Sequence, residues 1–195
     1  MEEHNIVKDA TVEVETDSKK DSEKNAKKEA TEWIQAIVTA VVLALLIRIF
    51  LFEIILVVGG SMIPTLDDGD RVFVNKIGYI IGEPELGDVV IFKTPEDGKT
   101  SYVKRVIGLP GDQVEIIDGI VYVNEESLSE PYISEQPFND FALETVPEGR
   151  IFVLGDNRNH SKDSRDYHVG FVPMDNLVGK AVWRIWPLDS LSAIK

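Results

Sequence analysis

The chain has 195 residues, a formal net charge of −14, no cysteine and 44% hydrophobic residues. This length suits one modest domain with appended segments, and the lack of cysteine excludes disulfides and thiolate chemistry. A chain this acidic repels polyanions, so nucleic acid is not expected as a partner.

Residues 1–32 consist mainly of Glu, Lys, Asp, Thr, Ser and Ala, with few large apolar side chains. Such a segment cannot bury enough apolar surface to offset the entropy of ordering. We therefore expect a disordered tail, whose last part, from Lys19 to Glu32, could form a nascent helix.

Residues 33–52 form an apolar run that only Gln35, Thr39 and Arg48 interrupt. At about 1.5 Å per residue the run is long enough to cross a hydrocarbon core of about 30 Å, so we predict a transmembrane helix in a lipid bilayer. A buried core helix and a cleavable signal peptide are the alternatives. The lysines of the tail precede this run, and the positive-inside rule therefore predicts a single-pass cell-membrane protein with a cytoplasmic N-terminus. Residues 53–195 would then be extracytoplasmic.

The rest of the chain is typical of short strands separated by turns, which indicates a mainly β fold with an antiparallel β-sheet domain. Asp118 and Gly119, between two β-branched runs, predict a hairpin. Residues from about 125 to 150 contain three prolines and read as an irregular excursion or a small subdomain. The expected strands are Arg71–Lys76, Asp88–Lys93, Ser101–Ile107, Gln113–Ile117, Ile120–Asn124, Ile151–Leu154 and Val178–Ile185.

A candidate nucleophile, Ser61, follows Gly59 and Gly60 and precedes Pro64. The glycines permit positive φ angles and leave the serine uncrowded, and proline prevents the turn from continuing as a helix. An ordinary turn leaving the membrane is the alternative. Because Ser61 is nine positions beyond Phe52, the end of the apolar run, it would lie within about 30 Å of the membrane surface.

Lys104 is the candidate general base, because no Ser-His-Asp pattern attaches to the histidines. Strand alternation places Lys104 between Tyr102 and Val106, and burial there would lower its pKa, with repulsion from Arg105 as a second cause. Arginine itself does not deprotonate. The alternative is an edge strand with solvated basic residues.

The third candidate segment is the polar loop of residues 155–165, which could be an ordinary surface loop or could position a catalytic group. In the second case Ser161 or Ser164 would orient the lysine, and Asp–Arg pairs would hold the loop. We expect no metal site and no cofactor, because the sequence has no Cys/His cluster and no calcium-loop spacing.

Taken together and in this order, four motifs resemble those of bacterial type I signal peptidases, in particular the Gram-positive members. The resemblance covers nearly everything from the apolar run onward. The motifs are Gly60-Ser61-Met62-Ile63-Pro64-Thr65-Leu66, Gly87-Asp88-Val89-Val90, Lys104-Arg105-Val106-Ile107-Gly108-Leu109-Pro110-Gly111-Asp112, and Gly155-Asp156-Asn157-Arg158 with Ser161 and Asp163-Ser164-Arg165.

The resemblance implies a membrane-anchored serine endopeptidase that removes signal peptides from secreted preproteins after small residues in an A-x-A pattern, working as a monomer. By motif position, Ser61 is the nucleophile, Lys104 is the general base and Ser161 orients the lysine. The supporting ionic residues implied in the same way are Arg105, Asp156, Asp163 and Arg165.

Two positions depart from the family pattern. Some Gram-negative members have a serine that assists the oxyanion hole where this chain has Gly59, and the spacing between Arg165 and Gly170 is longer than in many members. Two other functions stay open at this point. One is a soluble self-cleaving regulator with the same dyad, which the apolar run disfavours, and the other is a catalytically silent membrane-anchored binding module.

Overall fold

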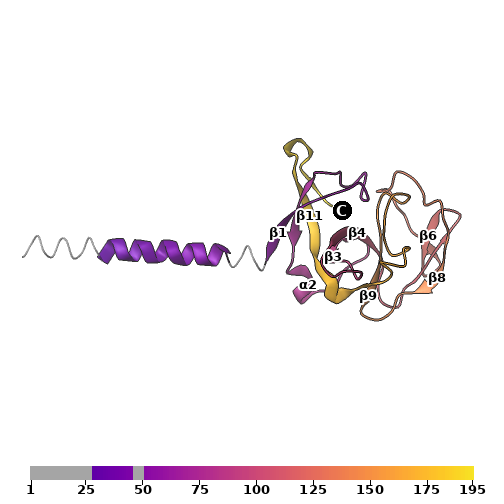
Figure 1. Cartoon of the computed structure of the whole chain (residues 1–195), viewed down its shortest axis with the longest axis horizontal. Coiled ribbons are helices and arrows are strands. Elements are labelled where there is room, and N and C mark those ends of the chain that lie inside the picture. The colour runs from indigo at the N-terminus through magenta and orange to yellow at the C-terminus, as the bar shows by residue number, and fades with distance from the viewer. Residues whose placement is uncertain (1–27, 46–50) are drawn as a thin grey trace, which may run out of the picture. The chain divides into compact units, whose positions relative to one another are not determined.

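The structure is a computed structural model that describes residues 28–45 and 51–195 (Figure 1). The chain divides into two compact units, residues 1–47 and residues 48–195. Most of the expected disordered tail, residues 1–27, lies outside the described residues, as do residues 46–50 of the predicted membrane span.

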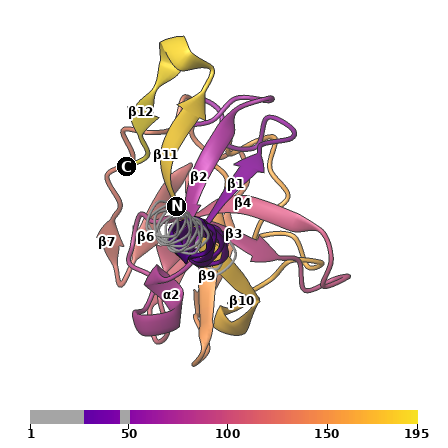
Figure 2. The ribbon, with the colours of Figure 1, turned by 90° about the vertical axis from the view of Figure 1, so that its left-hand side faces the viewer.

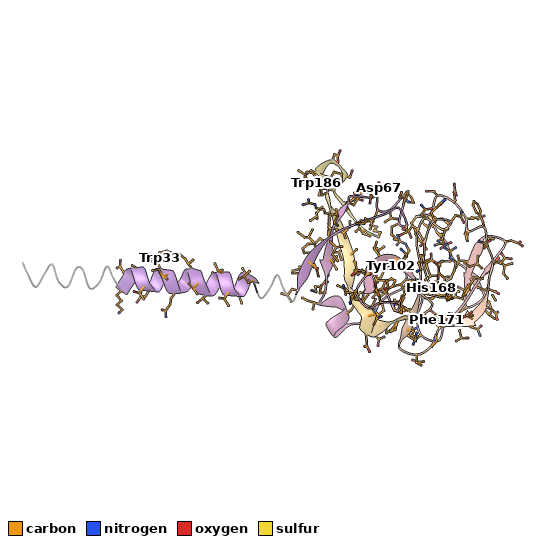
Figure 3. The ribbon with its side chains drawn as sticks, viewed as in Figure 1. Trp33, Asp67, Tyr102, His168, Phe171 and Trp186 are labelled. Atoms are coloured by element: carbon orange, nitrogen blue, oxygen red, sulfur yellow. The ribbon has the colours of Figure 1, made fainter. Side chains whose placement is uncertain are left out.

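Residues 28–45 form one helix whose apolar side chains, such as that of Trp33, are exposed (Figure 3). Its first residues belong to the segment that we expected in the tail. Phe52, the last residue of the expected span, is instead the first residue of a strand. Within the described part of the chain, no helix combines the length and the apolar character that a membrane crossing requires.

The larger sheet has eight strands, and all of its pairs are antiparallel, as predicted. Figure 2 shows β1, β2 and β11 side by side, with β12 folded back beside β11. In spatial order the strands are β1 (Phe52–Leu56), β2 (Arg71–Asn75), β11 (Leu177–Trp186), β3 (Val89–Lys93), β4 (Ser101–Gly108), β9 (Arg150–Leu154) and β10 (Val172–Pro173), with β12 (Ser192–Ala193) on β11.

The smaller sheet is built around the predicted hairpin. Its turn residues Asp118 and Gly119 have φ angles of 50° and 77°, the left-handed conformation that such a turn requires. The sheet order is β7 (Glu126–Ser127), β6 (Ile120–Val123), β5 (Gln113–Ile117) and β8 (Phe141–Thr145). Because β7 and β8 come from residues 125–150, that segment is not an irregular excursion throughout: it supplies both outer strands of a small subdomain.

Three short helical segments complete the domain, and they are α2 (Gly78–Ile81), η1 (Met174–Asn176) and η2 (Leu188–Ser190).

Central strands of the larger sheet are buried on both faces. Along β3, Val89 and Ile91 pack into one apolar cluster, whereas Val90 and Phe92 pack into another. A third cluster joins the two sheets through Phe152 of β9. Strands with two buried faces read as continuous apolar runs, which matches these sequences.

The first of these clusters also anchors the segment after Ser61. Met62 and Leu66 lie in it and are only 1% and 0% exposed. The next turn of chain after the nucleophile candidate is therefore held by core packing, and Ser61 is placed at the edge of a rigid cluster.

We expect Leu66→Ala to lower the free energy of unfolding by about 2–5 kcal/mol, because it removes a fully buried side chain and leaves a cavity. Leu86, which is 49% exposed, provides a matched control. Leu86→Ala should change that free energy by less than about 1 kcal/mol. Urea unfolding of the detergent-solubilised protein measures both, and equal effects would show that Leu66 does not anchor the turn.

Candidate active site

Ser61 lies in a turn between β1 and β2 that backbone and side-chain bonds hold closed. Gly59 has a φ of 90°, the positive value that the sequence led us to expect, and its N–H donates to Asp68 Oδ1 at 2.7 Å. The N–H of Leu66 donates to the Met62 carbonyl at 2.9 Å, immediately after the serine. The Ile63–Pro64 peptide bond within this turn is cis.

Lys104 of β4 reaches this turn directly. Its Nζ lies 2.6 Å from Ser61 Oγ and donates to the Val103 carbonyl at 2.8 Å. The Nζ also lies 5.3 Å from the centre of the Tyr102 ring, and the residue is only 3% exposed. The two predicted catalytic residues, 43 positions apart, are thus in hydrogen-bond contact, and the lysine is almost completely buried.

Burial lowers the pKa of Lys104 to about 8, because an ammonium ion loses its hydration in this site. The carboxylates of Asp163 and Asp156 act in the opposite direction and raise it. Our expectation that repulsion from Arg105 is a second cause was wrong. Arg105 instead forms an ion pair with Asp156, so its charge is compensated locally.

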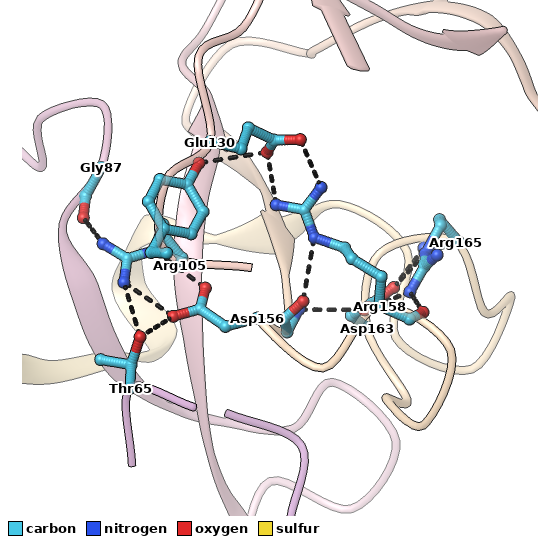
Figure 4. Close-up of polar contacts among 10 residues, drawn as sticks. Thr65, Gly87, Arg105, Glu130, Asp156, Arg158, Asp163 and Arg165 are labelled. Atoms are coloured by element: carbon cyan, nitrogen blue, oxygen red, sulfur yellow. Dashed lines mark hydrogen bonds and ion pairs between the residues drawn. The ribbon is translucent and has the colours of Figure 1, made fainter. Parts of the chain in front are cut away.

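Arg105 and Asp156 form a buried pair with two parallel bonds, shown in Figure 4. The Arg105 Nε and Nη2 atoms donate to the two carboxylate oxygens at 2.9 and 2.7 Å. The hydroxyl of Thr65, four residues after the nucleophile candidate, donates to Asp156 Oδ2 at 2.5 Å. This pair therefore connects β4, the loop after β9 and the turn that holds Ser61.

Asp163 and Arg165 make a second ion pair, with Arg165 Nε 2.8 Å from Asp163 Oδ1. The other oxygen of Asp163 accepts the Gly155 N–H at 3.0 Å, and Arg165 Nη2 donates to the Arg158 carbonyl at 2.6 Å. The pair closes the loop of residues 155–165 onto its own backbone, which supports the interpretation that this loop positions other groups.

Sequence reasoning missed a third buried pair, Arg158 with Glu130. Arg158 donates two bonds to that carboxylate at 2.8 and 2.5 Å, and its Nε donates to the Gly155 carbonyl at 3.1 Å. The ring of Tyr132 lies 3.9 Å from the guanidinium carbon of Arg105, and its hydroxyl donates to Glu130. Arg158 belongs to the Gly155-Asp156-Asn157-Arg158 motif, but nothing in the sequence around Glu130 indicated that Glu130 would pair with it.

The two candidate orienting serines differ in their surroundings. Ser164 Oγ accepts the Val153 N–H at 2.9 Å, so this hydroxyl is engaged by the backbone of β9. Ser161 Oγ is buried and has no hydrogen-bond partner in residues 28–45 and 51–195. It lies against Gly155, where a Cβ would come within 2.5 Å of Ser161 Cβ.

An open cavity of about 420 Å³ gives access to the Ser61–Lys104 contact. Its walls come from the segment of residues 55–61, from Ser101 to Lys104 of β4, and from His160 and Lys162. Most of the exposed lining is apolar, with Ser61, Lys104, His160 and Lys162 among its polar residues. Within residues 28–45 and 51–195, no group of three or more acidic or histidine side chains is arranged to hold a metal ion.

The two histidines of the domain have other partners. His168 Nδ1 lies 2.9 Å from Asp166 Oδ1, and His160 Nδ1 lies 3.3 Å from Asn157 Oδ1. Neither bond involves Ser61, whose hydroxyl contacts Lys104 instead.

Comparison with known proteins places these residues in a family. Residues 30–186 match the model of the signal peptidase family, peptidase S26. The chain is 43% identical to signal peptidase I T of Bacillus subtilis over 77% of this chain and 82% of that protein. It is 42% identical to the probable signal peptidase I-1 of a Synechocystis strain over 73% of this chain and 75% of that protein.

A crystal structure of a signal peptidase I from Enterococcus faecalis is 39% identical and aligns with a TM-score of 0.45, over 50% of this chain and 96% of the other. The family match spans most of the present sequence and includes all four motifs. The chain therefore belongs to the signal peptidase family, peptidase S26, and is a peptide-bond hydrolase that acts on signal peptides.

Proposed function

We propose that the hydrolysis proceeds through a Ser61–Lys104 dyad on secreted preproteins, with cleavage after small residues in an A-x-A pattern. The observation that carries the proposal is the 2.6 Å contact between Lys104 Nζ and Ser61 Oγ at an open cavity. A nucleophile within hydrogen-bond reach of a base is the arrangement that covalent catalysis requires. A catalytically silent binding module has no need of a lysine with a lowered pKa at this position.

In the first half of the reaction, neutral Lys104 accepts the Ser61 proton as Oγ attacks the carbonyl carbon of the scissile bond. The carbonyl π electrons move onto oxygen, and the Ser61 main-chain N–H donates to this oxyanion. The Lys104 ammonium then gives its proton to the leaving amine as the C–N bond breaks. Because Gly59 has no side chain and its N–H already donates to Asp68 Oδ1, this residue supplies no second donor.

In the second half, Lys104 accepts a proton from water, and the resulting hydroxide attacks the acyl-enzyme ester. The ester C–O bond breaks, and the proton returns to Ser61 Oγ. A pKa of about 8 leaves roughly a tenth of Lys104 neutral at pH 7, whereas a solvated lysine would be almost wholly protonated.

We further propose that Arg105, Asp156, Asp163 and Arg165 support the dyad by compensating one another's charges. Ser161 is proposed, from its motif position, to orient Lys104, although its buried hydroxyl lies beside Gly155 and makes no hydrogen bond within residues 28–45 and 51–195. Anchoring through residues 33–52 with the catalytic domain outside the cytoplasm would place Ser61 where a membrane-inserted signal peptide presents its cleavage site.

Ser61→Ala and Lys104→Met should each abolish cleavage of a preprotein, because one removes the nucleophile and the other removes the base. Detergent-solubilised protein incubated with a preprotein, followed by sequencing of the new N-terminus, measures both activity and cleavage position. His168→Ala should retain most of the activity and serves as the control. Full activity in either dyad variant would exclude the proposed mechanism, and total loss in His168→Ala would favour a histidine base.

Activity should rise with pH through an apparent pKa of about 8, because only the deprotonated form of Lys104 accepts the proton. Below this value the lysine is protonated and the rate falls tenfold per pH unit. The profile of kcat/KM against pH measures the rise. A rise centred near pH 6.5 that disappears in a histidine variant, or an unchanged profile in Lys104→Arg, would contradict the lysine assignment.

Gly155→Ala should lower kcat about 100-fold, because small displacements of a reacting group are costly in catalysis. The new Cβ would lie 2.5 Å from the Ser61 carbonyl oxygen and 2.5 Å from Ser161 Cβ, so both residues must move. Gly78→Ala is the matched control, since its nearest neighbour would be an Asn75 side-chain atom at 3.7 Å. Equal rates in the two variants would show that the site tolerates the displacement.

A further inference from the structure

Asn157 makes two bonds to consecutive carbonyl groups of the nucleophile turn, although it lies almost 100 residues further along the chain. Its side-chain Nδ2 donates to the Gly60 carbonyl oxygen at 2.9 Å. Its main-chain N–H donates to the Ser61 carbonyl oxygen at 3.0 Å. These two contacts hold the peptide units on either side of the Ser61 α-carbon.

The first contact also determines where the Ser61 N–H points. The Gly60–Ser61 bond is not one of the cis peptides, and in a planar trans peptide the C=O and the N–H point in opposite directions. A donor that holds the Gly60 oxygen on one side therefore directs the Ser61 N–H to the other side. In the proposed mechanism, this N–H donates a hydrogen bond to the oxyanion.

The local sequence leaves a role for such an external contact. Gly59 and Gly60 precede this peptide unit, and glycine restricts backbone rotation less than any other residue. Within the turn itself, the Gly60 carbonyl oxygen also accepts the Ile63 N–H, but at 3.3 Å this bond is longer than the one from Asn157. Without the shorter bond from Asn157, the Gly60–Ser61 peptide plane would have greater freedom to turn, and the direction of its N–H would be less well fixed.

Asn157 is itself firmly placed. It stands between Asp156, which pairs with Arg105, and Arg158, which pairs with Glu130. The other end of its amide, Oδ1, lies 3.3 Å from His160 Nδ1, which leaves Nδ2 facing Gly60. Two buried ion pairs and one side-chain contact thus hold the amide in the orientation that it needs.

We propose that Asn157 is a positioning residue that aims the Ser61 main-chain N–H at the oxyanion of the tetrahedral intermediate. The inference rests on the proposed function, because it takes Ser61 as the nucleophile. Asn157 acts on the charge that develops on the substrate oxygen and not on proton transfer by Lys104. It therefore affects transition-state stabilisation while leaving substrate affinity and the pH dependence in place.

The test uses two substitutions in the full-length, detergent-solubilised protein. Asn157→Asp keeps the size and the main-chain bond but sets a carboxylate against the Gly60 carbonyl oxygen. Asn157→Ala removes the amide without adding a charge. If the aspartate variant does not fold, the alanine variant still tests the positioning role. Asn159→Ala is the matched control, because that amide lies in the same loop and bonds to the Phe138 N–H and the Gln136 carbonyl instead.

Loss of one oxyanion donor typically lowers kcat by about 10²–10³, so we expect a decrease of about 10–100-fold when the donor is misdirected. KM for a peptide substrate, the apparent pKa near 8 and the melting temperature should stay close to those of the unchanged protein. A peptide aldehyde provides a second readout, since Ser61 Oγ adds to its carbonyl carbon and produces the same oxyanion. Its affinity should fall in parallel with kcat, whereas Asn159→Ala should leave both unchanged.

The Ser61→Ala variant distinguishes failure of the proposed function from failure of the positioning role of Asn157. If Ser61→Ala still cleaves, the proposed function fails and the role of Asn157 fails with it. If Ser61→Ala is inactive but both Asn157 variants keep kcat and aldehyde affinity within twofold, only the positioning role is wrong. A decrease in kcat that comes with a shifted pH profile or with an equal decrease in Asn159→Ala would likewise overturn it.

Discussion

The proposed chemistry of the site depends on the burial of one amine, Lys104 Nζ, away from water. Lys104 Nζ is held by Ser61 Oγ and the Val103 carbonyl, in a position that is 3% exposed. The loss of hydration destabilises the ammonium form and so brings the lysine pKa to about 8. A solvated lysine in the same geometry would be protonated near neutral pH and could not accept the serine proton.

The surrounding charges have to be arranged so that they do not undo this effect. Asp156 and Asp163 both raise the Lys104 pKa, and unpaired buried carboxylates would do so more strongly. Each carboxylate is paired with its own arginine, Arg105 or Arg165. Removal of one partner from a buried pair leaves an uncompensated charge, which is strongly destabilising. These arginines therefore help to keep the pKa of Lys104 low, and they also stabilise the loop.

The proposed nucleophile, Ser61, is held by two different kinds of interaction. Met62 and Leu66 pack into an apolar cluster on one side of the turn, and the loop that contains Asn157 bonds to the turn on the other. Apolar packing restrains position, whereas the hydrogen bonds also set the direction of individual peptide planes. An oxyanion donor needs both, because its contribution depends on its distance and on its angle to a single atom.

Local patterns were sufficient for much of the fold. Alternating and apolar segments predicted the main strands of the larger sheet, and Asp118-Gly119 predicted the hairpin of the smaller one. Local patterns did not predict strands whose own residues lack an alternating or bounded apolar pattern. Phe52 was assigned to the membrane span and residues 53–56 were not predicted as a strand, yet Phe52–Leu56 pairs with β2. Phe141–Thr145 lies in a proline-containing segment and becomes a strand because β5 offers it an edge.

The sequence alone also indicated the candidate site residues, since a serine after two glycines, a lysine in an apolar strand and an Asp/Arg-rich loop are recognisable one by one. Only the tertiary structure decided how they meet. The partners of Arg105, Arg158 and Gly60 lie between 28 and 97 residues away in sequence. No local pattern encodes such distances, because a hydrogen bond or an ion pair between remote residues exists only after the strands and loops that carry them have packed.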